Sequence, residues 1–202
     1  MDYGVGNLAS VEKAFHFIGS DAVVTSDTEF ILSSDAVVLP GVGAFADAMK
    51  NLKSAGMIEV VREIIKSNKA FLGICLGMQL LFEYSEEGGG RTDGMGIFKG
   101  AIKQLPPDMN LKVPHMGWNS LNTASGNPLF NDLPQNPFVY FVHSYYLTAC
   151  DRNIVAATAT YGIGFDAAIG SGRVYATQFH PEKSGEVGLT ILKNWVSLVR
   201  RY

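Results

Sequence analysis

The stretch FLGICLGMQLLF, residues 71–82, places a cysteine between two glycines where an apolar run gives way to a helical pattern. Its first part, Phe71–Ile74, predicts a strand, and Met78–Phe82 predicts a helix after it. Glycines at 73 and 77 permit a tight turn and close approach of neighbouring backbone. This is the cysteine form of the G-x-S-x-G nucleophile elbow, so we expect Cys75 on a sharp strand-to-helix turn.

The chain before this stretch alternates strand-like and helical segments. The short apolar runs Ala22–Val24 and Ala36–Leu39 predict strands, while Leu8–Ile18 and Met57–Ser67 carry apolar residues at helical spacing. Such alternation predicts an α/β fold with a mostly parallel central sheet flanked by helices. Ligands of these sheets bind beyond the carboxyl ends of the strands, so each strand exit is a candidate site.

The second half of the chain reads as strands joined by turns, which predicts an additional, smaller antiparallel sheet. The expected strands are Ile97–Leu105, Pro114–Leu121, Phe138–Thr148, Ile154–Tyr161, Phe165–Ile169 and Val174–Phe179. A hairpin turn is expected at Gly170-Ser171-Gly172, and a closing helix over Val187–Val199. No internal repeat is visible, and we expect residues 1–202 to form one domain. Only Met1–Tyr3 precede the loop Gly4-Val5-Gly6, which predicts a weakly supported first strand.

Composition excludes several classes of function. Hydrophobic residues make up 47% of the 202 positions, enough for one sizeable core. The net charge of −3 gives no footprint for nucleic acid or an anionic membrane. Two cysteines are no disulfide framework and indicate a reducing compartment. We see no secretory signal, and the longest apolar run, Ala70–Phe82, is too short to span a bilayer. We therefore expect a cytoplasmic protein.

Cys75 is the candidate nucleophile. The N–H groups at the start of the following helix favour a thiolate, and the N–H of Leu76 is placed to stabilise an oxyanion. The alternative is a buried core cysteine at a strand end, the commoner role of a lone cysteine.

His180 and Glu182, in QFHPEKS at residues 178–184, are the candidate partners of Cys75. Residues i and i+2 of an extended segment point to one side, so Glu182 is expected to reach the imidazole. That contact sets the tautomer and leaves the other ring nitrogen to take the thiol proton. The alternative is a surface turn with a capping glutamate. Together with the cysteine elbow, the three residues form a nucleophile, a base and an orienting carboxylate.

Two glycine-containing loops remain. Pro40-Gly41-Val42-Gly43 leaves a predicted strand and either presents N–H groups to a negative charge or is a plain turn. The segment Gly4–Ala9 fits G-x-G-x-x-A, but lacks a full preceding strand, so we interpret it as a turn with Asn7 as helix N-cap. The histidines have no zinc-like spacing, and we expect neither a metal nor a cofactor.

These motifs together resemble the class I, or triad, glutamine amidotransferases. The similar stretches are GICLGMQLLF (73–82), PGVGAF (40–45) and QFHPEKS (178–184). Three more, DYGVGN (2–7), HMGWN (115–119) and YFVHSY (140–145), resemble the glutaminase subunits of imidazole glycerol phosphate synthases. The resemblance covers essentially the whole chain.

The resemblance implies that Cys75 attacks the side-chain amide of glutamine, releasing ammonia and then glutamate. It implies a heterodimer in which the ammonia passes to a (β/α)₈ cyclase subunit that makes imidazole glycerol phosphate and an aminoimidazole carboxamide ribotide in histidine biosynthesis. It also implies roles for further residues. The implied oxyanion donors are Val42, Gly43 and Leu76; the implied substrate contacts are Gly41, Gln79, Glu87, His143, Ser144 and Tyr145; and Trp118, Tyr140 and Lys183 are implied at the subunit interface.

Other functions fit parts of the sequence. Amidotransferases serving guanylate, anthranilate or pyridoxal phosphate synthesis share the triad, but are expected to differ at HMGWN. A peptidase or thiol esterase would use the same triad, whereas Gln79 and Glu87 suggest a small polar substrate. A regulatory protein with a dead site is disfavoured by an intact Cys75, His180 and Glu182.

Overall fold

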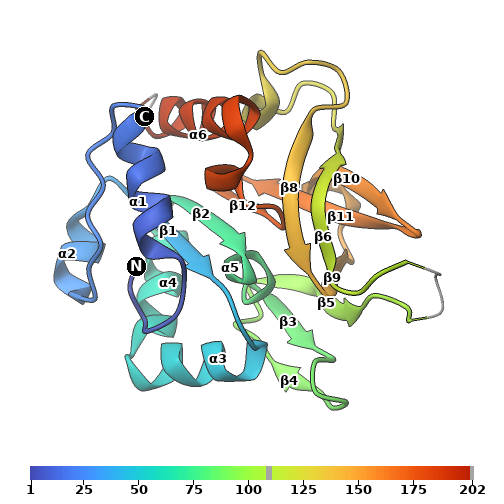
Figure 1. The fold of residues 1–202 in the computed structure, drawn as a ribbon. Coiled ribbons are helices and arrows are strands. Elements are labelled where there is room, and N and C mark those ends of the chain that lie inside the picture. Colours follow the sequence, from blue (N-terminus) through green and yellow to red (C-terminus); the bar gives the residue numbers. More distant parts are fainter. Residues whose placement is uncertain (108–110, 201–202) are drawn as a thin grey trace.

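The computed structural model describes residues 1–107 and 111–200, drawn in Figure 1. The α-helices are α1 (Leu8–Phe17), α2 (Thr28–Ser33), α3 (Phe45–Ser54), α4 (Met57–Lys66), α5 (Leu76–Gln79) and α6 (Gly185–Arg200). The strands are β1 (Ala36–Gly41), β2 (Ala70–Cys75), β3 (Phe82–Ser85), β4 (Thr92–Asp93), β5 (Phe98–Gln104), β6 (His115–Ser120), β7 (Asn122–Thr123), β8 (Phe138–His143), β9 (Tyr145–Ala149), β10 (Val155–Tyr161), β11 (Ile163–Ser171) and β12 (Val174–Thr177). Short 3₁₀ turns are η1 (Pro128–Phe130), η2 (Arg152–Ile154) and η3 (Pro181–Lys183).

The central sheet is mixed, and the prediction of a mostly parallel sheet is wrong. Its order is β1-β2-β12-β11-β9-β5-β3-β4, with β10 pairing β11 and β7. Only the β1–β2, β2–β12 and β3–β5 pairs are parallel among the described residues. Parallel neighbours need long crossovers, usually helical, and between α5 and α6 the described chain has only 3₁₀ turns. The second half therefore returns by hairpins, and the predicted small antiparallel sheet is present as β6–β8.

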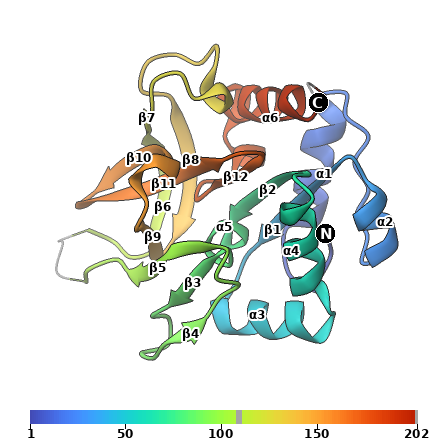
Figure 2. The ribbon, with the colours of Figure 1, turned by 180° about the vertical axis from the view of Figure 1, so that it is seen from behind.

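Helices cover both faces of the parallel part. In Figure 1 α1 lies in front of β1 and β2, and in the reversed view of Figure 2 α4 lies in front of them. Alternation along β2 explains the two layers, because Phe71 packs into the core with α2, α3 and α4, whereas Leu72 packs into the core with α1 and α6. The predicted helix stripe is confirmed at Trp195 of α6, which meets Phe15 of α1 edge-on at 5.7 Å.

Two local predictions differ from the structure at the chain's start. The run Ala22–Val24 is not a strand, and Val23 is 57% exposed. Residues 1–7 also form no strand, as the short segment predicted, although the Met1 amino group donates to the Val38 carbonyl at 2.8 Å. Without a strand at Met1–Tyr3, the 22–24 run has no ladder to join. Asn7 is the N-cap residue of α1, but its side chain makes no capping hydrogen bond.

The helix after Cys75 is shorter than predicted and shifted. It spans one turn, Leu76–Gln79, and Phe82 opens strand β3 instead of closing the helix. The run Leu80–Phe82 is fully buried. Short apolar runs fit a buried strand as well as a helix, and periodicity alone does not separate the two. No helix in residues 1–107 and 111–200 is both long and apolar enough to cross a membrane.

Candidate active site

The predicted sharp turn at Cys75 is present. Cys75 ends β2 with φ 55° and ψ −112°, a backbone conformation that non-glycine residues adopt only when the surroundings enforce it. A Cβ on Gly77 would lie 1.9 Å from the Leu39 carbonyl oxygen, and one on Gly73 would lie 2.9 Å from the Gly77 oxygen. Both glycines are therefore required by close backbone packing, and the elbow is locked against β1.

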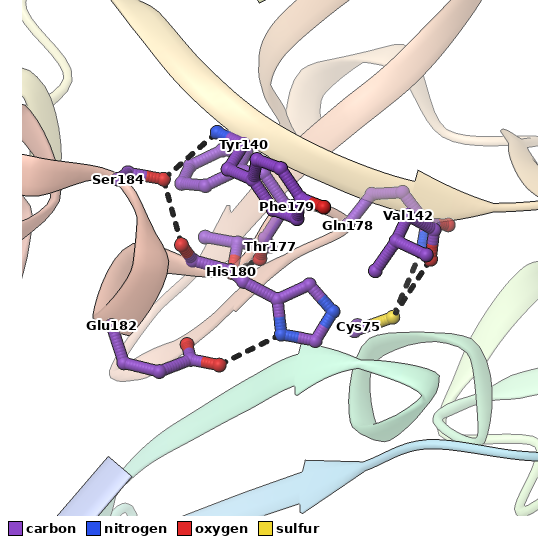
Figure 3. A network of polar contacts seen from close by, with 9 residues as sticks. All are labelled: Cys75, Tyr140, Val142, Thr177, Gln178, Phe179, His180, Glu182 and Ser184. Carbon is purple, nitrogen blue, oxygen red and sulfur yellow. Dashed lines mark hydrogen bonds and ion pairs between the residues drawn. The ribbon is translucent and has the colours of Figure 1, made fainter. Parts of the chain in front are cut away.

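His180 and Glu182 make the predicted contact. His180 Nδ1 lies 2.8 Å from Glu182 Oε1, and the two side chains are only 2% and 1% exposed. Figure 3 shows the imidazole turned toward the Cys75 sulfur. The local backbone differs from the prediction, because Pro181–Lys183 form the turn η3 rather than an extended segment. Among the described residues, His180 Nε2 has no hydrogen-bond partner and remains available for a reacting atom.

The environment favours the charged form of His180. Burial lowers the pKa of this imidazole, but its interaction with Cys75 and its contact with Glu182 outweigh burial. Their joint effect raises the pKa of His180 from 6.5 to about 9. At neutral pH the ring therefore carries a proton beside the sulfur.

Strand β8 holds the His180 turn in place. The Tyr140 N–H donates to Ser184 Oγ at 2.9 Å, and the Ser184 hydroxyl donates to the His180 carbonyl at 2.7 Å. The His180 N–H returns to the Tyr140 carbonyl at 3.0 Å. Figure 3 shows the two bonds of Ser184, to Tyr140 and to the His180 carbonyl. The base is thus tied to the small β6–β8 sheet as well as to the central sheet.

The exit of β1 lies beside the elbow. Gly41 is the register partner of Cys75 in the parallel β1–β2 pair, so Val42 and Leu76 follow side by side. Gly41 is buried, and a Cβ there would lie 2.7 Å from the Tyr3 hydroxyl and 2.9 Å from the Gly77 nitrogen. Beyond this contact the chain opens to solvent, since Val42 is 39% exposed. The predicted oxyanion residues therefore adjoin the sulfur-bearing turn.

The loop from Val42 to Ala44 is anchored at both ends. The Tyr3 hydroxyl donates to the Pro40 carbonyl at 3.0 Å, and the Phe45 N–H donates to Glu87 Oε2 at 2.6 Å. Between these anchors Gly43 has φ 93°, and a Cβ there would meet nothing within 4 Å. Glu87, predicted to contact substrate, thus also fixes the start of α3.

The predicted substrate contacts Gln79, His143 and Tyr145 are joined by hydrogen bonds. Gln79 Nε2 donates to the Tyr145 carbonyl at 3.0 Å, and His143 Nδ1 lies 2.9 Å from the same oxygen. Because that nitrogen donates to a carbonyl, His143 Nε2 is the acceptor of the neutral ring and takes the N–H of His115 Nδ1 at 2.9 Å. Ser144, between the two strands, is half-buried.

The His115–His143 contact was not predicted from the sequence. The two residues are register partners in β6 and β8, and both face inward. Burial lowers the pKa of His115 to about 4 and that of His143 to about 3, so both rings are neutral at ordinary pH. Pairing HMGWN with YFVHSY across a hairpin-like sheet would have been the signal. Within the described residues, no cluster of three or more histidine, cysteine or acidic side chains could hold a metal ion.

The outward side of β6–β8 is apolar and exposed. Trp118 is 56% exposed and meets Tyr140 edge-on at 6.2 Å, while Lys183 on the neighbouring turn is exposed. Met116 and Phe138 on the same side are 61% and 56% exposed. The residues predicted at a subunit interface therefore share one surface, directly outside the His180 turn.

A buried cysteine on a strained elbow thus faces a histidine that contacts a glutamate, the arrangement that the sequence predicted. The chain matches the model of the class I glutamine amidotransferases over residues 2–198, and it belongs to that family.

Within this family, the chain is similar over its full length to one kind of subunit. The chain is 49% identical over 200 residues to the imidazole glycerol phosphate synthase subunit HisH of Caldanaerobacter subterraneus, covering 99% of this chain and 97% of the relative. It is 48% identical over 202 residues to the HisH subunit of Bacillus cereus, covering 100% and 95%.

Solved structures share the fold at low identity. A crystal structure of a glutamine amidotransferase has a TM-score of 0.73 at 17% identity, covering 96% of this chain and 95% of that one. The structure of PurLQS from Thermotoga maritima has a TM-score of 0.71 at 18% identity, covering 98% and 96%. At these identities the likeness concerns the fold alone.

Proposed function

We propose that residues 1–202 form one class I glutamine amidotransferase domain that acts as the glutaminase subunit of an imidazole glycerol phosphate synthase in histidine biosynthesis. The observation that carries the proposal is Cys75 at φ 55° facing the His180–Glu182 pair. The full-length likeness to HisH subunits at 48–49% identity supports the choice among amidotransferases. The substrate is glutamine, and the useful product is ammonia.

The first half of the reaction forms a thioester. With the proton of the pair on His180, the Cys75 sulfur attacks the side-chain amide carbon of glutamine as a thiolate. The amide oxygen takes the negative charge, and the imidazolium gives its proton to the departing nitrogen. The C–N bond breaks, and ammonia leaves a glutamyl thioester on Cys75.

The second half releases glutamate. Neutral His180 takes a proton from water, whose oxygen attacks the thioester carbon. The C–S bond then breaks, glutamate leaves and the sulfur becomes a thiolate beside the reprotonated ring. Glu182 holds the ring in one orientation through its 2.8 Å contact with Nδ1 and stabilises the charge it carries in both halves.

Backbone N–H groups at two neighbouring strand exits stabilise the oxyanion. Leu76 lies on the locked elbow, while Val42 and Gly43 lie in the open loop beside it. Removing one such donor in related chemistry costs about 10²–10³ in kcat. Gly41, Gln79 and Glu87, with the 143–145 segment, form the glutamine pocket, where the neutral His143 acts through the backbone it fixes.

The ammonia serves a (β/α)₈ cyclase subunit in a cytoplasmic heterodimer. The exposed apolar side chains Met116, Trp118 and Phe138, with Tyr140 and Lys183, support a partner surface on β6–β8. Large exposed apolar patches are typical of interaction sites. Because Tyr140 is bonded to the His180 turn, this surface and the base are parts of one hydrogen-bonded unit.

Glutaminase turnover with and without partner tests the proposal. The chain is assayed for glutamate release alone, with a purified HisF-type cyclase, and with that cyclase plus its nucleotide substrate. We expect low turnover alone and a clear increase with the loaded partner. High turnover in isolation that neither addition changes would count against the subunit assignment.

Covalent labelling tests the nucleophile separately. A glutamine-like electrophile is incubated with the chain, and adducts are mapped by peptide mass spectrometry. We expect the adduct on Cys75, with Cys75→Ala unlabelled and Cys150→Ala labelled like the parent chain. Cys150 is the matched control because it is the other free cysteine and is exposed. An adduct confined to Cys150 would refute the mechanism.

A further inference from the structure

A buried carboxamide touches the sulfur and has no part in the steps above. Gln178 follows β12 directly and is 0% exposed. Its side-chain Nε2 lies 3.7 Å from Cys75 Sγ, within hydrogen-bond range for sulfur. Figure 3 shows the side chain of Gln178 directed at Cys75 from the side opposite Glu182. A second hydrogen-bond donor, besides His180, therefore lies beside the sulfur.

The direction of this carboxamide is fixed by its neighbours. Gln178 Oε1 accepts from Gln79 Nε2 at 2.9 Å, and the same nitrogen of Gln79 donates to the Tyr145 carbonyl at 3.0 Å. A carbonyl oxygen only accepts, so Tyr145 obliges Gln79 to present its NH₂ group. That NH₂ group in turn obliges Gln178 to present its oxygen. Flipping the Gln178 carboxamide would place its NH₂ group against the NH₂ group of Gln79 and turn its oxygen toward the sulfur. The Nε2 atom of Gln178 must therefore face Cys75.

An N–H group at this position distinguishes the thiolate form of Cys75 from the thiol form. The Val142 carbonyl oxygen lies 4.0 Å from the sulfur, and it accepts from a thiol but repels a thiolate. The N–H of Gln178 acts in the opposite sense, since hydrogen bonds to an ionised group are the stronger kind. The site is buried, which strengthens the discrimination.

We propose that Gln178 is a further catalytic residue: its side-chain N–H stabilises the Cys75 thiolate, and Gln79 is the positioning residue that keeps that N–H aimed at the sulfur. The inference rests on the proposed function, because it assigns Cys75 as the nucleophile. It also adds a role for Gln79, whose side-chain NH₂ group donates both of its hydrogens to protein acceptors, the Tyr145 carbonyl and Gln178 Oε1.

The test is the pH dependence of Cys75 alkylation by iodoacetamide in Gln178→Met. Methionine keeps the length and apolar bulk of the side chain but has no N–H. Peptide mass spectrometry separates Cys75 from the exposed Cys150. We expect alkylation below the midpoint of the pH–rate profile to slow about tenfold, because a lost bond to a charged group is worth at least about 1.4 kcal/mol. The midpoint of the pH–rate profile should rise by about one unit, and the rate at high pH should recover.

The recovery at high pH separates this role from a structural one, in which the rate would change at every pH. Gln135→Met is the matched control, because Gln135 is exposed in a loop and should leave the profile unchanged. Gln178→Glu is the second variant. It retains an oxygen for Gln79 and places an acceptor at the sulfur, so it should raise the midpoint as well.

An unmoved midpoint in Gln178→Met overturns the inference, and so does one in Gln178→Glu if the methionine variant fails to fold. Failure of the parent chain to be labelled at Cys75 would instead refute the proposed function. A labelled parent chain with unshifted variants would leave the proposed function standing and remove only the role of Gln178.

Discussion

The exits of β1 and β2 lie side by side in one parallel register, yet they are built in opposite ways. At the β2 exit, Cys75 is buried and Gly77 packs directly on the Leu39 carbonyl. At the β1 exit, Val42 is exposed, and a methyl group added at Gly43 would meet nothing within 4 Å. The nucleophile is therefore fixed by close packing, whereas the loop that carries the proposed second oxyanion donor has open space around it. The two halves of the site differ in how tightly their neighbours enclose them.

The largest expected effect is on stability, in paired glycine substitutions. Gly77→Ala should lower the free energy of unfolding by about 3 kcal/mol or more, because its Cβ cannot avoid the Leu39 oxygen. Gly43→Ala should cost about 1 kcal/mol, for its positive φ alone. Urea denaturation followed by circular dichroism measures both. Equal losses would break the contrast between a locked and an open exit.

The next effect concerns activity at the open exit. Val42→Pro removes the proposed donor N–H and should lower partner-stimulated glutaminase turnover about 10²-fold. Val42→Ala keeps the N–H and should retain turnover within about threefold. Alkylation of Cys75 should be unchanged in both, since the elbow does not depend on this loop. If Val42→Pro also slowed alkylation, the two exits would not be independent.

Acid should lower the free energy of unfolding through the buried pair His115 and His143. The unfolded chain binds a proton on each histidine below about pH 6.5, whereas buried His115 and His143 stay neutral down to about 4 and 3. Stability should therefore fall from pH 6.5 toward 4, by about 1.4 kcal/mol per pH unit for each of the two rings. Urea midpoints at pH 6.5 and 5.5 measure the slope.

The matched variants for this prediction are His115→Gln and His16→Gln. His16 is an exposed histidine on α1, and its replacement is the control for loss of a histidine outside the buried pair. His115→Gln should reduce the slope, because one proton uptake is removed from the unfolded chain. A slope identical in all three proteins would contradict the assignment of the acid sensitivity to the buried pair.

The smallest expected effect is a shift in the pH dependence of turnover, set by His180 beyond the end of β12. Protonated His180 is needed to release ammonia, so turnover should decline as pH rises through about 9. Glu182→Gln removes a contact that raises this pKa, and the alkaline limb should move down by about one pH unit. Glu186→Gln, at an exposed position nearby, is the control and should not move it. An alkaline limb that ignores Glu182 would show that the limb belongs to another group.

The sequence predicted what short-range pattern determines. Glycines around Cys75 predicted the elbow, and the spacing of His180 and Glu182 predicted their contact, although a 3₁₀ turn rather than an extended segment delivers it. The mixed sheet was missed because strand direction depends on connections, and the run Leu80–Phe82 reads equally as helix or strand. The roles of Cys75, His180 and Glu182, and of the oxyanion and substrate residues, stay predictions for the experiments above.

Contacts between segments that lie far apart in the sequence could not be predicted from it. His115 and His143 meet only because β6 and β8 pair in one particular register, and nothing in either motif alone specifies it. Gln178 was visible as part of QFHPEKS, but its contact with Cys75 spans 103 positions. Its amide direction follows from Gln79 on helix α5 and Tyr145 on strand β9.

The steric lock at Gly73 and Gly77 also sets how this site could be re-engineered. Neither position accepts a single added carbon, so most members of a mutant library that randomised the elbow would be chains that do not fold. Gly43 carries no such restriction, and its loop adjoins the same elbow. Directed evolution toward a different amide should therefore begin in that loop, where shape can vary while the reactive thiol stays where it is.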